Sequence, residues 1–244
     1  MTNNRQPFLR PTGADWRPER EAAPLVARKL TRAMGGHPVV VRADLAVRIG
    51  ELVALTGANG AGKTTLLRCL AGRLRPTSGE VLWFGLAPSP ASHRLLGYAA
   101  HEGHLYPELT ASENLLFAAR MYSLPQPQER VVEMLAKTGM TRYSGQAAGR
   151  LSQGLRQRLS LARALIHDPP IVLLDEPFAG LDAAGRAWLE NWLGELRTAQ
   201  RAIIFTSHDD HQCRVLADRT LELQSGRLQT ATTTDALTKV RIAG

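Results

Sequence analysis

A short apolar run followed by a glycine-rich turn most constrains what this chain can fold into. Residues 52–56 form the run, which leads directly into Gly57-Ala58-Asn59-Gly60-Ala61-Gly62-Lys63-Thr64-Thr65. The glycines let the backbone curl, so that several N–H groups point into one hollow at the start of the next helix. The stretch predicts a strand, a phosphate-binding loop and a helix; the alternative is a glycine-rich turn with an accidental lysine.

Two side chains of this loop are expected to contact the phosphates or a metal ion. Lys63 can reach the outer phosphates of a bound nucleotide as a point charge, and Thr64 can place its hydroxyl on a Mg²⁺ ion. We therefore expect a nucleotide and Mg²⁺ as ligands. The expected nucleotide-binding residues of the loop are Gly57, Ala58, Asn59, Gly60, Ala61, Gly62, Lys63, Thr64 and Thr65.

The composition fits a globular chain without membrane segments. A length of 244 residues allows one large domain or two small ones, and 44% hydrophobic residues suffice for a core. The net charge of +8 is spread without a long Lys/Arg run, so we expect no nucleic-acid partner. We find no apolar stretch long enough for a membrane helix, no signal peptide and no metal or redox pattern of cysteines, which favours the cytosol.

The chain divides into regions that differ in residue composition and in hydrophobic pattern. Residues 1–24 alternate arginines with prolines and predict a disordered arm, and 231–244 form a tail. The domain between them, 25–230, begins with an antiparallel β portion, for which we expect strands at 39–41, 45–49 and 79–85. Residues 87–168 then predict a helical insertion, with a loop at the prolines near 88–90 and helices at 110–122, 129–138 and 155–167.

The rest of the domain predicts an α/β fold with a parallel sheet. Buried strands are expected at 171–174 and 202–205, with a helix at 183–197 between them. A final hairpin is expected about Ser225 and Gly226.

Two carboxylates end the first of these buried strands, at Asp175 and Glu176. Open α/β sheets bind ligands at the carboxyl ends of their strands. Asp175 suits a Mg²⁺ ion, directly or through water, and Glu176 suits orienting and activating a water against the outermost phosphate. The alternative is a strand followed by an acidic helix cap.

Three further motifs occur in a specific order after the phosphate loop. They are Leu151-Ser152-Gln153-Gly154, Ala179-Gly180-Leu181-Asp182 and Thr206-Ser207-His208-Asp209. With these motifs, residues 25–230 resemble the ATP-binding subunit of an ABC transporter. The resemblance implies a P-loop NTPase core of the ABC type, with an antiparallel β portion and a helical insertion.

The resemblance also implies roles and partners. Lys63, Glu176 and His208 would act in ATP hydrolysis. Ser152, Gln153 and Gly154 would bind the nucleotide of a second copy, which implies a head-to-tail homodimer with two ATP molecules between the subunits. A membrane permease would hold this dimer at the cytoplasmic face of the inner membrane as a peripheral subunit.

Two positions depart from the family pattern. His101 stands where the family has a glutamine that contacts the metal, although an offset of one residue would place Glu102 there. His101 is therefore a tentative Mg²⁺ ligand. Met34 stands near the position of the adenine-stacking aromatic residue, where its polarizable sulfur can pack on the base.

The sequence says less about which residues contact the permease and about which substrate is transported. Leu105 and Tyr106 precede a helix on a loop and are expected to contact the permease, whereas Leu115 is expected in the core. The histidine at 101 and the motif at 109–115 resemble the haem-exporter ATP-binding subunit of cytochrome c maturation. The alternative is a drug, small-molecule or lipid exporter. A soluble ABC ATPase acting on ribosomes or DNA would carry a second nucleotide domain or a long coiled coil, and neither is visible.

Overall fold

The computed structural model describes residues 23–100 and 104–230. The predictions made for residues 1–22, for His101 and Glu102, and for 231–244 lie outside the described residues. None of the described helices is long and apolar enough to cross a membrane.

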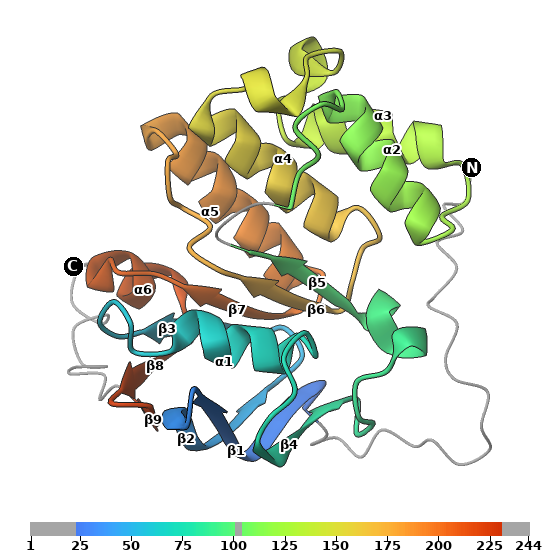
Figure 1. Ribbon diagram of the computed structural model, residues 1–244. Helices are drawn as coiled ribbons and strands as arrows, with labels where there is room; N and C mark the ends of the chain where they lie inside the picture. The colour runs from blue at the N-terminus through green and yellow to red at the C-terminus, as the bar shows by residue number, and fades with distance from the viewer. Residues whose placement is uncertain (1–22, 101–103, 231–244) are drawn as a thin grey trace, which may run out of the picture.

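Two sheets organise the chain (Figure 1). The larger has the strand order β5-β6-β7-β3-β8-β9, parallel from β5 to β8, with β9 antiparallel to β8. Its strands are β3 (Leu52–Thr56), β5 (Leu96–Ala99), β6 (Ile171–Leu174), β7 (Ala202–Thr206), β8 (Arg219–Gln224) and β9 (Arg227–Thr230). The smaller is antiparallel, with the order β2-β1-β4, and consists of β1 (Leu25–Met34), β2 (His37–Val47) and β4 (Ser78–Trp83).

Helices cover the larger sheet and form the insertion. They are α1 (Lys63–Leu70), α2 (Ala111–Met121), α3 (Pro127–Lys137), α4 (Gln153–Leu165), α5 (Ala183–Thr198) and α6 (Asp210–Leu216), with 3-10 turns η1 (Pro90–Leu95), η2 (Thr141–Tyr143) and η3 (Ala148–Arg150). Figure 1 shows α1 between the two sheets, and α2, α3 and α4 at the end of the molecule opposite the small sheet. This is the α/β core with an antiparallel β portion and a helical insertion that the sequence predicts.

Two hydrophobic cores fix this arrangement. Leu66, Leu67 and Leu70 of α1 are fully buried in one core, together with side chains of both sheets. The other core joins the helical insertion and α5 to the opposite face of the larger sheet. The phosphate loop is therefore anchored at both ends, by the central strand β3 and by a buried helix.

One strand of the small sheet differs from the prediction. The sequence suggested separate strands at 39–41 and 45–49 because Asp44 interrupts the apolar pattern, but β2 runs unbroken from His37 to Val47. The side chain of Asp44 instead accepts a hydrogen bond from the N–H of Lys29 at 2.8 Å, within an irregular part of the β1–β2 pairing. Asp44 therefore fits within a continuous strand, because its side chain accepts a hydrogen bond from the neighbouring strand.

The helix signals were more reliable than the loop signals. Thr110 and Glu113 form a reciprocal cap at the start of the predicted helix α2, with N···O distances of 2.8 and 3.2 Å between backbone nitrogen and side-chain oxygen. The helix predicted from residue 129 begins two residues earlier, because Pro127 fits in the first turn of α3, where a missing N–H costs nothing. The predicted loop around Pro90 contains the η1 turn, and α6 was not predicted.

Candidate active site

The phosphate loop connects β3 to α1, and its backbone requires glycine. Gly57 and Gly62 have φ values of 136° and 103°. A Cβ atom would lie 2.4 Å from the carbonyl oxygen of Leu223 at the first position, and 2.8 Å from that of Val39 at the second. Side chains are therefore excluded at both positions, and the loop packs directly on β8 and β2.

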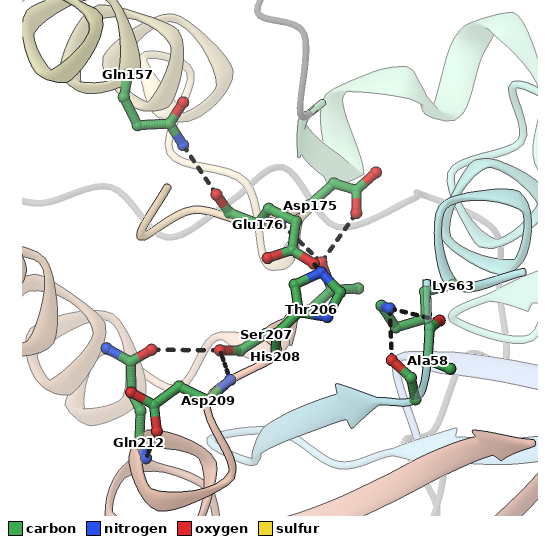
Figure 2. Close-up of polar contacts among 11 residues, drawn as sticks. Ala58, Lys63, Gln157, Asp175, Glu176, Thr206, Ser207, His208, Asp209 and Gln212 are labelled. Carbon is green, nitrogen blue, oxygen red and sulfur yellow. Dashed lines mark hydrogen bonds and ion pairs between the residues drawn. The ribbon is translucent and has the colours of Figure 1, made fainter. Parts of the chain in front are cut away.

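Lys63 begins α1 and is only 7% exposed. Its ammonium group donates to the carbonyl oxygens of Gly57 at 2.7 Å and Ala58 at 3.1 Å, as Figure 2 shows. No side chain caps the start of α1, and its first turn contains no acidic residue. The positive end of the helix and the lysine charge thus lie together at the loop, as an anion site requires.

Asp175 and Glu176 follow β6, where the sequence predicted them. Asp175 is 1% exposed, and one of its carboxylate oxygens accepts a hydrogen bond from the Thr206 hydroxyl at 2.9 Å. The same hydroxyl oxygen accepts from the N–H of Glu176 at 2.7 Å. Glu176 has a φ of 52°, which is unusual for a residue with a side chain. Thr206 therefore holds both acidic residues, including the strained one (Figure 2).

His208 completes this group. Its Nε2 lies 2.7 Å from Oε1 of Glu176, close enough for the imidazole to hold the carboxylate in place. The loop that carries His208 is fixed by Ser207, whose hydroxyl donates to the Gln212 side chain at 3.3 Å and accepts from the N–H of Asp209 at 3.1 Å. The histidine thus comes from the end of β7 with a defined direction toward Glu176 (Figure 2).

A hollow of about 440 Å³ brings these parts together. Its lining combines the loop and the start of α1 with the two residues that would act on a water: Asn59, Gly60, Gly62, Lys63, Thr64, Thr65, Glu176 and His208, together with Val39 and Ala179. Positive charge therefore lies on one side and a carboxylate held by a histidine on the other. This arrangement suits the terminal phosphate of a nucleotide and an attacking water.

Other predicted site residues lie outside this hollow. Ser152, Gln153 and Gly154 do not line it, and Ser152 caps α4 by accepting from the N–H of Leu155 at 3.3 Å. Met34 is absent from the lining as well; it is 50% exposed at the end of β1.

Two residues near the site were missed by the sequence reasoning. Thr206 ends β7 beside Asp175, because Leu174 pairs with Phe205 in the parallel sheet. Gln157 of α4 donates to the carbonyl oxygens of Pro177 at 3.0 Å and Glu176 at 3.4 Å. A polar residue at the end of an apolar strand is a signal that could have found Thr206, whereas nothing local marks Gln157.

The chain is similar to known proteins of one family. The family model described as ABC transporter matches residues 40–179. The ABC transporter ATP-binding protein NatA of Bacillus subtilis (strain 168) is 35% identical over 191 residues, which are 76% of this chain and 78% of that protein. The SkfA peptide export ATP-binding protein SkfE of Bacillus subtilis (strain 168) is 37% identical over 189 residues, 76% of this chain and 79% of that protein.

Solved structures agree with these relatives. An ATP-binding subunit of an ABC transporter superposes with a TM-score of 0.80 and 27% identity, over 86% of this chain and 90% of that one. A dimeric ATP-binding cassette in a post-hydrolysis state, bound to ADP and phosphate, has a TM-score of 0.78 at 24% identity, over 86% and 99% of the two chains. At that identity the second likeness shows the fold alone.

The fold and the hollow define the class of this protein as a P-loop ATPase. The family match and the relatives make the assignment narrower: the chain belongs to the ABC transporter family. It is an ATP-binding subunit, and the family to which it belongs is one of ATP hydrolases.

Proposed function

We propose that this chain hydrolyses ATP with Mg²⁺ as a homodimer and thereby drives a membrane permease, as a peripheral subunit at the cytoplasmic face of the membrane. The observation that carries the proposal is the hollow that joins Lys63, Glu176 and His208. A binding module that only holds nucleotide would not need a carboxylate and a histidine 2.7 Å apart at the phosphate end.

The side chains of the hollow divide the chemistry between them. Lys63 and the N–H groups at the start of α1 hold the outer phosphates and neutralise their charge. Glu176 orients the attacking water and accepts its proton. The imidazole of His208 holds the Glu176 carboxylate and lines the hollow, where it can donate to the terminal phosphate.

The residues present fit a Mg²⁺ ion. Oδ2 of Asp175 is buried and has no hydrogen-bond partner among the described residues, so it is available to the ion or to a water bound to it. Thr64 lines the hollow, whereas Asp175 does not line it but directly precedes Glu176, which does. In the described part of the chain no three His, Cys, Asp or Glu side chains gather into a metal site, so phosphate oxygens would complete the coordination. Bound Mg²⁺ would spread the negative charge of the phosphates, and a contribution of His101 stays a prediction.

A second copy would complete each site. One chain offers one hollow and one Ser152–Gly154 segment, and the two do not meet within the chain. In a head-to-tail dimer, the start of α4 from one copy would close the hollow of the other, with Ser152, Gln153 and Gly154 facing the terminal phosphate. Stacking of the base on Met34 likewise stays a prediction.

Replacement of Glu176 by Gln tests this proposal. The variant keeps the size of the side chain and loses the base, so ATP should still bind while turnover falls by orders of magnitude. A dimer should accumulate with ATP in size-exclusion chromatography. Glu129→Gln, an exposed position on α3, is the control and should behave as wild type. A monomer with near-normal turnover in Glu176→Gln would contradict the proposal.

An apolar groove in the insertion is the proposed docking surface for the permease. It has a volume of about 640 Å³ and lies between η1, β5, α2 and α4; we call it the insertion groove. Tyr106, Phe117 and Met121 line it and are 42%, 40% and 69% exposed. Leu105, in contrast, packs against the core, which corrects its predicted exposure, and Leu115 is buried as predicted.

Tyr106→Ala tests the docking surface. The Tyr106 and Phe117 rings meet edge to face at 5.0 Å, so the substitution removes one wall of the insertion groove without entering the core. Recovery of the membrane subunit in a pull-down should fall, with ATP binding unchanged. Val132→Ala removes an apolar side chain that is 65% exposed on α3, and it serves as the matched control. Equal recovery by both variants would place the docking surface elsewhere.

The transported substrate is proposed on sequence alone. The motif at 109–115 favours haem export in cytochrome c maturation, with a drug, small-molecule or lipid exporter as the alternative. The relatives named above do not support the haem assignment, since SkfE is named for peptide export. Identification of the membrane protein that co-purifies with this chain decides between the two: a cytochrome-maturation protein supports the first and a drug permease the second.

A further inference from the structure

One side chain of the helical insertion contacts the backbone that carries the proposed base. Gln157 lies near the start of α4 and is only 9% exposed. Its amide nitrogen donates to the carbonyl oxygens of Pro177 at 3.0 Å and Glu176 at 3.4 Å (Figure 2). Gln157 is not among the residues that line the hollow. It therefore acts on the backbone beside the carboxylate and not on the nucleotide.

The backbone of Glu176 needs support from its surroundings. Glu176 has a φ of 52° and precedes Pro177, although a residue before a proline ordinarily has an extended backbone. Such a conformation persists only where neighbouring groups fix it. Thr206, at the end of β7, holds the N–H of Glu176 at 2.7 Å, and Gln157 holds the carbonyl side from α4. The direction of the carboxylate thus depends on two parts of the molecule, the larger sheet and the helical insertion.

The start of α4 contacts the same segment at a second point. Residues 176–180 supply part of the lining of the hollow. At their far end, a Cβ atom on Gly154 would lie 3.0 Å from the carbonyl oxygen of Gly180. A Cβ atom on Gly180, in turn, would lie 2.7 Å from Cγ of Gln153. Both ends of the segment therefore pack on α4, and α4 cannot shift without disturbing Glu176.

We propose that Gln157 is a positioning residue for ATP hydrolysis, which aligns the Glu176 carboxylate with the attacking water by holding the peptide between Glu176 and Pro177. The inference rests on the proposed function, in which Glu176 accepts the proton of that water. Since Gln157 does not line the hollow, the affinity for ATP does not depend on it. The turnover number depends on it, because turnover requires the carboxylate in one direction.

Gln157→Met tests the role of the amide. Methionine has a similar length and no donor, so the side chain still fills its place in α4. We expect kcat to fall at least about tenfold, since a small misplacement of a catalytic group can cost about a hundredfold in rate. The KM for ATP should stay within about twofold in steady-state assays. A kcat within about twofold of wild type would overturn the inference.

Gln157→Glu provides a second test if the methionine variant does not fold. Glutamate has the shape of glutamine, but it presents an acceptor to the two carbonyl oxygens in place of a donor. Its kcat should fall at least as much as that of the methionine variant, again with an unchanged KM. A glutamate variant with wild-type kcat would overturn the inference as well.

A double-mutant cycle separates positioning from general support of the fold. In Glu176→Gln the carboxylate is absent, so the residual hydrolysis no longer depends on its alignment. Addition of Gln157→Met should therefore change the residual single-turnover rate by less than about twofold. A further tenfold loss in the double variant would mean that Gln157 supports the structure as a whole, and it would overturn the inference.

Arg158→Met is the matched control. Arg158 is the next residue of α4, and it donates to the carbonyl oxygen of Thr138 at 3.1 Å, at the end of α3. It also stacks over the ring of Trp188 in α5 at 4.5 Å, so this variant loses contacts of α4 that do not involve Glu176. Its kcat should stay within about twofold of wild type, with both variants folded by circular dichroism. An equal loss of kcat in Arg158→Met would assign the effect to α4 in general and overturn the inference.

The two proposals fail in different ways. Near-normal turnover in Glu176→Gln would overturn the proposed function, and the role of Gln157 with it. Wild-type kcat in the Gln157 variants, together with an inactive Glu176→Gln, would overturn the role of Gln157 and leave the proposed function standing.

Discussion

Thr206→Val removes one hydroxyl that two active-site residues share. Thr206 is fully buried; it accepts from the N–H of Glu176 at 2.7 Å and donates to Asp175 at 2.9 Å. Valine has nearly the same shape, so little packing changes. The substitution leaves the partly buried N–H of Glu176 unpaired and a buried carboxylate without a donor, since the other oxygen of Asp175 also has no partner among the described residues.

The cost follows from these two losses. An N–H shielded from water without a partner costs up to about 1–3 kcal/mol, and a lost hydrogen bond to a charged group about 1.5–3 kcal/mol. We therefore expect the free energy of unfolding to fall by about 2.5–6 kcal/mol, a large share of the roughly 5–15 kcal/mol typical of a domain. Turnover should fall as well, because Glu176 keeps its strained backbone only while its N–H is held. ATP affinity should change little, since Lys63 and the phosphate loop are untouched.

Urea unfolding followed by circular dichroism measures the first effect, and steady-state hydrolysis the second. Thr206→Ser is the control: it keeps the hydroxyl and loses one methyl group, for about 1 kcal/mol. The reasoning is refuted if the valine and serine variants unfold within about 1 kcal/mol of each other, which is the accuracy such a comparison allows.

Three further substitutions or conditions test other parts of the molecule. Lys63→Ala removes the charge at the loop and should weaken ATP binding at least tenfold, about 1.4 kcal/mol, in a titration; unchanged affinity would contradict the phosphate-loop assignment. Met34→Tyr should tighten ATP binding by about 0.5–1 kcal/mol through stacking, and no gain would mean that the base packs elsewhere. Burial lowers the pKa of His167 from 6.5 to about 4, so the unfolded chain takes up the proton first as the pH falls. Stability is complete above pH 6.5 and should be lost progressively toward pH 4, by at most about 3 kcal/mol. His167→Phe keeps a ring on Tyr122, where the wild-type rings stack at 3.7 Å, and should flatten the dependence of the urea midpoint on pH.

The sequence predicts well where a local pattern decides the structure. The strand of residues 171–174 has the predicted bounds, since four consecutive apolar residues between prolines and carboxylates leave few alternatives. Likewise, the Thr110 cap specifies the start of α2 through its own hydrogen bonds. The phosphate loop is recognisable from the sequence because its backbone has positive φ values that favour glycine.

Prediction fails where distant segments decide. Gln157 belongs to α4, and its contact with Pro177 depends on how the insertion packs on the core. The strand break expected near Asp44 is absent because Lys29, on the neighbouring strand, supplies a donor. Leu105 lies on a loop yet packs inward, which only the tertiary arrangement determines.

The strand order also has a consequence for synthesis on the ribosome. β3 ends in the phosphate loop, yet both its neighbours, β7 and β8, come much later in the chain. At roughly 5–20 residues per second, on the order of ten seconds separates the synthesis of Leu52 from that of its partner Ile203. During that time the apolar strand β3 has no neighbours on either edge, and Thr206 has not yet been made to hold Asp175 and Glu176. The phosphate loop is therefore synthesised long before the strands that flank β3. We expect ATP to stabilise the fold only after β7 has paired with β3.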